Sequence, residues 1–148
     1  MKNITINGKE YKFEYSIEAS LYEDCAGCLM DFFIGAGMAE GAATSGNAKD
    51  AAETLKGTLI SIPQRTLTLF HAGLLENYGF SKEESKDLLK SYIKESKKSY
   101  TEIMNELIGI VGDDNFFELI GLDKILTKES NTKPKKKKEA GENTSTEQ

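Results

Sequence analysis

Two cysteines have the spacing that most directly could do chemistry. Cys25 and Cys28 form a C-x-x-C pair, a pattern found in redox-active thiols and in half of a zinc site. Zinc needs two further Cys or His ligands, and His71 is the only histidine. A redox pair belongs at the start of a helix after a strand, whereas this pair lies within a helical apolar pattern with Leu21 and Phe32. We therefore expect two reduced cysteines in the core.

His71 and the glycines are the remaining candidates for chemistry. A histidine that acts as a general base needs an orienting partner and a nearby nucleophile, and no nucleophile motif accompanies His71. The glycines of residues 35–48 match neither the dinucleotide-binding fingerprint nor the phosphate-binding loop. The carboxylates are scattered over helix faces that should be solvated. The sequence predicts a protein that is not an enzyme and uses no cofactor or metal ion.

The first fifteen residues predict the structure that starts the fold. In "ITINGKEYKFEY", polar and apolar residues alternate on both sides of Asn7-Gly8. Asn-Gly tolerates the positive φ angles of a tight turn, so this pattern is typical of a β-hairpin, here at residues 2–15. An isolated hairpin is only marginally stable, so its aromatic face should pack on the following helices.

The apolar period then changes to that of α-helices. A first helix is expected from about Ser16 to residue 33, a second from about residue 48, and a third after Pro63, which should interrupt the pattern. Ser81 and Ser99, each followed three residues later by Glu, should begin two more helices, and residues 115–126 should form a short one. The predicted fold is α+β and mostly helical, with the N-terminal β-hairpin packed on four to six α-helices.

Residues 127–148 differ in composition from the rest of the chain. They contain no large apolar residue, so we expect a folded domain at 1–126 and a disordered Lys-rich tail at 127–148. The Gly-rich residues 35–48 should form a loosely ordered loop. The tail has six lysines and four glutamates, which is a net charge of +2. The whole chain has a formal charge of −5, so residues 1–126 carry about −7. Such an acidic domain is a poor binder of nucleic acid, so proteins are the expected partners.

No apolar run is long enough for a transmembrane helix, and the start of the chain lacks the continuous apolar region of a secretory signal. The sequence therefore predicts no membrane association and reduced thiols in a cytoplasm.

One segment, "NFFELIGL", is too apolar for a helix with a single buried stripe. Either it is buried on most sides or it offers a partner surface, for which the candidate residues are Phe116, Phe117, Leu119, Ile120 and Leu122.

The order of these features resembles a known family. The start "ITINGKEYKFEY", the central "LTLFHAGLLENYGFSKEESKDLLKSYI" and the later "YTEIMNELIGIVGDDNFFELIG" are similar in pattern to the tail assembly chaperones of long-tailed bacteriophages that infect Gram-positive bacteria. The resemblance covers about residues 1–126 and rests on pattern and order, without a diagnostic motif. It carries no catalytic residues.

The resemblance implies a function in tail morphogenesis. Proteins of this family are thought to coat the aggregation-prone tape measure protein and to help bring tail-tube protein to it. They act in the host bacterial cytoplasm and are absent from the mature virion. The sequence leaves open whether copies of this protein also associate with one another. The alternative is a small structural tail or connector protein, which would remain in the particle.

Four consecutive lysines, Lys135 to Lys138, have two interpretations. Lysine codons are A-rich, and many proteins of this family are made in two forms by programmed ribosomal frameshifting, so the run is a candidate slippery site in the message. A solvated basic linker explains the same residues by composition alone. A nucleic-acid-binding tail is disfavoured, because no aromatic residues accompany the lysines.

Overall fold

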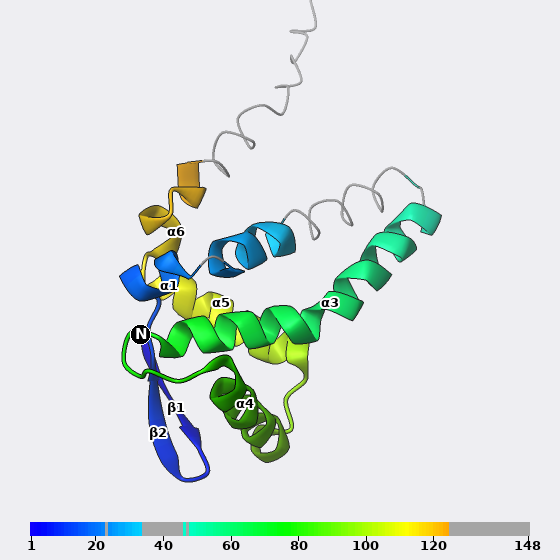
Figure 1. The fold of residues 1–148 in the computed structure, drawn as a ribbon. Helices are drawn as coiled ribbons and strands as arrows, with labels where there is room; N and C mark the ends of the chain where they lie inside the picture. Colours follow the sequence, from blue (N-terminus) through cyan, green and yellow to red (C-terminus); the bar gives the residue numbers. More distant parts are fainter. Residues whose placement is uncertain (23, 34–45, 47, 125–148) are drawn as a thin grey trace, which may run out of the picture.

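The computed structural model describes residues 1–22, 24–33, 46 and 48–124. Most of the predicted loop at 35–48 and all of the predicted tail at 127–148 lie outside the described residues. The chain forms an N-terminal β-hairpin followed by helices, as predicted (Figure 1). In chain order, the elements are β1 (Lys2–Ile6), β2 (Lys9–Phe13), α1 (Ile17–Leu21), a helical segment at 24–33, α3 (Ala48–Leu74), α4 (Lys82–Ser96), α5 (Tyr100–Asp113) and α6 (Phe116–Leu119).

The hairpin has the predicted turn. β1 and β2 pair antiparallel with Ile6 opposite Lys9, and the two turn residues, Asn7 and Gly8, have φ angles of 52° and 77°. Both angles lie in the left-handed region that a two-residue hairpin turn requires and that Asn-Gly supplies at low cost. The alternation predicted from the sequence puts Ile4 and Ile6 in the core.

The aromatic end of the hairpin docks onto α3, where Gly73 allows a close approach. A Cβ on Gly73 would lie 2.8 Å from Cδ1 of Phe13 and 3.0 Å from the Tyr15 ring. The Gly73 carbonyl accepts a hydrogen bond from the Glu14 amide at 2.9 Å, and the Tyr15 hydroxyl donates to the Leu69 carbonyl at 2.7 Å. The hairpin is thus fixed to the helices by main-chain contact as well as by apolar packing.

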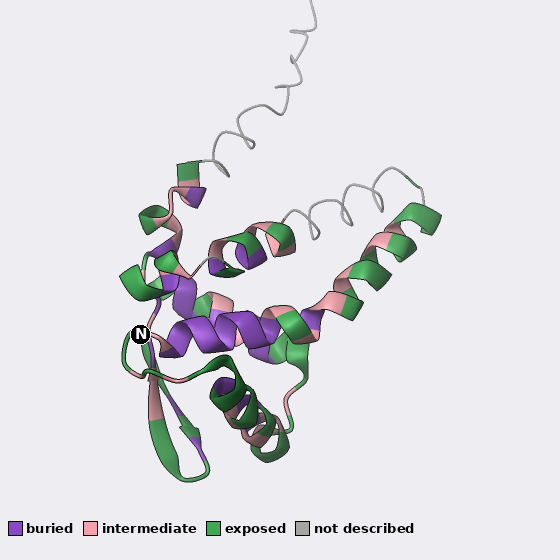
Figure 2. Cartoon of the chain, in the orientation of Figure 1, coloured by how far each residue is buried: buried purple, intermediate pink, exposed green. Residues whose placement is uncertain are grey.

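α3 is the central element and corrects one prediction. The sequence predicted that Pro63 would divide this region into two helices, but α3 runs through Pro63 without a break. The proline instead marks a change in environment: α3 is exposed or half-buried through residue 61 and largely buried from Ile62 onward (Figure 2). Figure 1 shows α3 bending between these two halves, which is the usual effect of proline inside a helix. The buried half contacts α4, α5 and β2, and this packing offsets the lost hydrogen bond.

The helices after α3 begin where the sequence predicted. Ser81 and Ser99 each accept a hydrogen bond from the amide of the Glu three residues later, and that Glu carboxylate accepts one from the serine amide. These two capping boxes satisfy amides that the helices cannot pair internally. They set the starts of α4 and α5 independently of tertiary packing.

The predicted single helix from Ser16 to residue 33 is wrong. α1 ends at Leu21, Tyr22 is extended with ψ of 107°, and a second helical segment occupies residues 24–33. Ala19 and Cys25 are both buried, yet six residues along one straight helix would place them about 120° apart around its axis. The break turns both toward the core, and it leaves Leu21, predicted to face the core, 72% exposed.

The apolar segment after α5 is also divided. α6 is a single turn at Phe116–Leu119, and Gly121 then takes a φ of 77° before residues 122–124 resume helical structure. Glycine adopts this left-handed conformation readily, and here it separates the turn of α6 from the helical residues that follow. Phe116 and Leu122 are consequently both buried although they lie in separate turns.

Candidate partner-binding surface

The cysteine pair is located as the sequence predicted. Cys25 and Cys28 are both buried free thiols. Burial raises the pKa of Cys25 to about 12 and that of Cys28 to about 11. A thiol with such a pKa carries almost no thiolate at neutral pH, and the thiolate is the form that attacks disulfides or binds metal. Among the described residues, no group of three or more His, Cys, Asp or Glu is placed to hold a metal ion.

His71 has a partner that the sequence did not predict. Its Nδ1 lies 2.8 Å from Ser85 Oγ, the distance expected of a base and a nucleophile. Ser85 is completely buried and His71 nearly so, so a substrate could not reach the hydroxyl. Burial and, to a lesser degree, the charge of Lys82 lower the pKa of His71. The pair is a buried hydrogen bond that ties α3 to α4.

The predicted partner surface needs a correction. Phe116 is 0% exposed, so it cannot contact a partner in this conformation, and Leu122 is 4% exposed. Phe117 and Ile120 are half-buried against the core. Of the five candidate residues, only Leu119 is well exposed, at 53%. The high apolar content of this segment therefore reflects burial on several sides, which was one of the two interpretations left open.

Leu119 forms a small exposed apolar area with α1. It lines a pocket of about 520 Å³ together with Ile17, and Ile17 and Leu21 are both more than half exposed. Residues four apart lie on one face of a helix, so Ile17 and Leu21 point the same way. The rest of the pocket includes the carboxylates of Glu14, Asp113 and Asp114.

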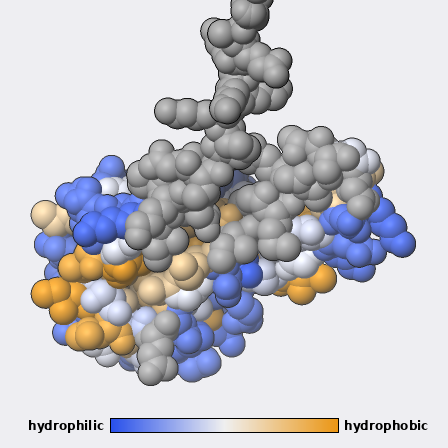
Figure 3. Space-filling model, turned by 90° about the horizontal axis from the view of Figure 1, so that it is seen from above, coloured by the Kyte–Doolittle hydropathy of each residue, from blue (hydrophilic) through white to orange (hydrophobic). Residues whose placement is uncertain are grey.

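A second exposed apolar surface lies on the first half of α3, which we call the α3 arm (residues 48–61). Its exposed large side chains are Leu55, Leu59 and Ile60, at 52%, 54% and 70%. With Ala52 and Lys56 they line a shallow pocket of about 380 Å³. We call these three side chains the arm face. Figure 3 shows hydrophobic surface on the arm beside the hydrophilic residues of its first turns.

The sequence predicted a helix here from its apolar period, and that period did not show whether the arm face is buried or exposed. Periodicity indicates which residues share a face and does not indicate what covers that face. The arm stands away from the hairpin and from α4 and α5 (Figure 1). A stripe of this kind on a soluble protein is a common mark of a protein–protein contact.

Comparisons of the chain with models of protein families, with curated proteins and with solved structures found no match. Within residues 1–22, 24–33 and 48–124, no helix is both long enough and apolar enough to span a membrane.

Proposed function

We propose that this protein is a phage tail assembly chaperone that binds the tape measure protein and aids assembly of the tail tube, without enzymatic activity. The proposal starts from the resemblance in sequence pattern. The structural observation that supports it best is the arm face, a stripe of three large aliphatic side chains at least half exposed on a helix that projects from the domain.

The chemistry of the arm face suits a long helical partner with repeated apolar residues. Leu55 and Leu59 are one turn apart and Ile60 is adjacent, so the three form a strip along the helix. Such a strip can pack against the apolar stripe of another helix in the manner of helix–helix contacts. A tape measure segment bound in this way would no longer expose its apolar stripe to other copies.

The charge of the domain supports the same role. Residues 1–126 carry about −7, from the formal −5 of the chain and +2 of residues 127–148. Several copies of an acidic protein bound along one partner repel other such complexes and stay soluble. The acidic surface also disfavours a function that requires binding to nucleic acid.

Co-expression with the tape measure protein of the same genome tests the proposal. We expect the wild-type chain to keep the tape measure soluble and to co-purify with it. The double variant Leu55→Asp/Leu59→Asp should lose at least tenfold of the co-purified tape measure, because two desolvated carboxylates oppose apolar packing. The matched control is Ile17→Asp/Leu21→Asp, which places the same charges at the same spacing on α1.

An equal loss of co-purified tape measure protein in both double variants would mean that binding depends on exposed apolar residues in general. That result would contradict a specific role for the arm. A soluble tape measure without the chain, or no co-purification with the wild type, would contradict the proposed function. The structural alternative, a tail or connector protein, predicts that the chain is retained in purified particles.

A further inference from the structure

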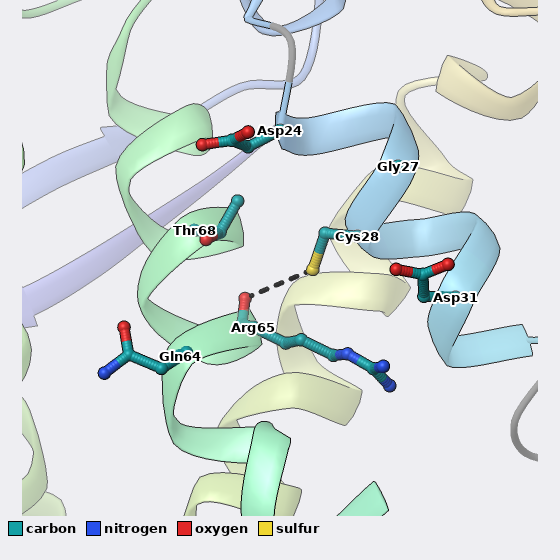
Figure 4. Close-up of a pocket in the computed structure, with 7 residues that line it drawn as sticks. All are labelled: Asp24, Gly27, Cys28, Asp31, Gln64, Arg65 and Thr68. Carbon is teal, nitrogen blue, oxygen red and sulfur yellow. Dashed lines mark hydrogen bonds between the residues drawn. The ribbon is translucent and has the colours of Figure 1, made fainter.

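A recess lies where the helical segment 24–33 passes α3. It has a volume of about 290 Å³, and Figure 4 shows that one wall comes from segment 24–33 and the other from α3. The lining residues are Asp24, Gly27, Cys28, Asp31, Gln64, Arg65 and Thr68. The Cys28 thiol donates to the main-chain carbonyl of Arg65 at 3.5 Å, which joins the two walls at the floor.

A second, apolar pocket adjoins the recess. Its volume is about 180 Å³, enough for one aliphatic side chain, and its lining is Ala26, Gly27, Met30, Ile120 and Leu122. Gly27 belongs to both pockets and so marks where they meet. We call this apolar pocket the Gly27 socket. Ile120 and Leu122 come from the segment that the sequence singled out as a partner surface. In the structure these two residues line the Gly27 socket and do not belong to α6.

Gly27 lies in a helix although its neighbours do not require a glycine. A Cβ built on it meets no atom within 4 Å, in contrast to Gly73. Glycine costs about 1 kcal/mol relative to alanine inside a helix. Packing within the described residues therefore does not explain its presence, whereas a partner side chain that lies against the helix backbone would.

Arg65 and two carboxylates are the charged residues of the recess beside the socket. The Arg65 Nη1 atom is buried and has no hydrogen-bond partner among the described residues. Because this nitrogen is buried, a partner cannot reach it in this conformation, so it takes no part in the site. Asp24 and Asp31 are exposed on the same stripe of the helix as Gly27, about 10 Å apart by the helical rise. Two surface carboxylates thus flank Gly27 along the helix.

We propose that the recess and the Gly27 socket together bind a peptide segment of a partner protein in which an apolar side chain is flanked by lysine or arginine. The apolar side chain fills the socket, and the basic side chains pair with Asp24 and Asp31. The two carboxylates favour a basic segment over an acidic one. This site goes beyond the proposed function, since it uses none of the arm face and selects segments by charge.

Fluorescence anisotropy with the full chain tests the site. The probe is a short fluorescein-labelled peptide in which leucines are flanked by lysines, and the control peptides carry glutamate for lysine or serine for leucine. We expect saturable binding of the first peptide only. Asp24→Asn/Asp31→Asn should weaken it several-fold and reduce its dependence on salt, because exposed charge pairs are screened.

The variant Gly27→Leu isolates the socket. It fills open space and so should fold, with at least tenfold weaker binding of the leucine–lysine peptide. Gly109→Leu is the matched control, because Gly109 is also an exposed helical glycine with no atom within 4 Å of a built Cβ; it should bind as the wild type does. Circular dichroism melts verify folding of both.

Wild-type affinity in Gly27→Leu, equal loss in Gly109→Leu, or equal binding of the glutamate peptide would each overturn the site. A gain in affinity when Lys135 to Lys138 are all replaced by serine would also overturn it, because the tail of the chain would then be the natural occupant. The arm variant Leu55→Asp/Leu59→Asp should bind the peptide normally. A result that contradicts peptide binding at the Gly27 socket can therefore be distinguished from one that contradicts tape measure binding at the arm face.

Discussion

At the residue scale, Glu106 is the centre of the main charged network. Its carboxylate accepts hydrogen bonds from Lys2 at 2.8 Å, Lys98 at 2.8 Å and the Tyr92 hydroxyl at 2.7 Å. Burial acts to raise the pKa of Glu106, but these three hydrogen bonds outweigh it and lower the pKa to about 2. The network links β1 to α5 and to the end of α4.

Glu106→Gln should therefore lower the free energy of unfolding by about 2 kcal/mol at pH 7. A lowered carboxyl pKa stabilises the fold above the unfolded pKa of about 4.3, and the stabilisation is lost as pH falls through about 2. The difference in the free energy of unfolding between wild type and variant should thus shrink as the pH falls from about 4.3 to about 2. Urea unfolding at several pH values measures it. Glu83→Gln, in an exposed pair with Lys86, should change stability very little; an equal loss there would contradict the assignment.

The buried pair of His71 and Ser85 makes a second prediction at this scale. Ser85→Ala should cost about 1–2 kcal/mol, because it leaves a buried imidazole nitrogen without its partner. The pKa of His71 is lowered, so below about pH 6.5 the unfolded chain binds a proton that the folded chain resists. Stability should fall as pH drops from that value, and His71→Gln should remove this fall. Ser91→Ala on the same helix is the control; a similar cost there would refute the pairing.

At the scale of elements, the docking of the hairpin on α3 depends on Gly73. Gly73→Ala should destabilise the protein by about 2–3 kcal/mol, because the new methyl group would lie 2.8 Å from the Phe13 ring. Gly109→Ala in α5, where a Cβ meets open space, should instead stabilise by up to about 1 kcal/mol. Thermal melts of both variants test this contrast, and a stabilised Gly73→Ala would show that the hairpin does not approach α3 so closely.

The sequence predicted the elements that local chemistry determines. Asn7-Gly8 and the serine-glutamate pairs at Ser81 and Ser99 act over a few residues, so their turn and helix starts were confirmed. It failed at Pro63 and Tyr22, where packing decided the outcome. The buried half of α3 keeps a proline within a helix, and the core requires a break between Ala19 and Cys25.

The candidate site was only partly predictable for a similar reason. Phe116 and Leu119 are equally apolar in the sequence, and the single turn of α6 buries one and exposes the other. Leu55, Leu59 and Ile60 have the period of a core stripe. Their exposure depends on where the other helices lie, which no local pattern records.

At the scale of the whole molecule, an acidic domain carries a projecting apolar arm. This combination suits a protein that covers the apolar stripe of a partner and is later released. Mass spectrometry of purified particles should therefore detect the tail-tube protein and not this chain. Stoichiometric amounts of the chain in particles would instead favour a structural tail or connector protein.

The central claim is that the arm face binds the tape measure protein. Hydrogen–deuterium exchange of the chain, alone and with the tape measure protein, tests it most directly. The arm amides should exchange quickly in the free chain, because the arm has little tertiary packing. We predict that residues 52–61 become strongly protected in the complex, with little change in α4 and α5. Unchanged exchange in the arm when the complex has formed would contradict the claim.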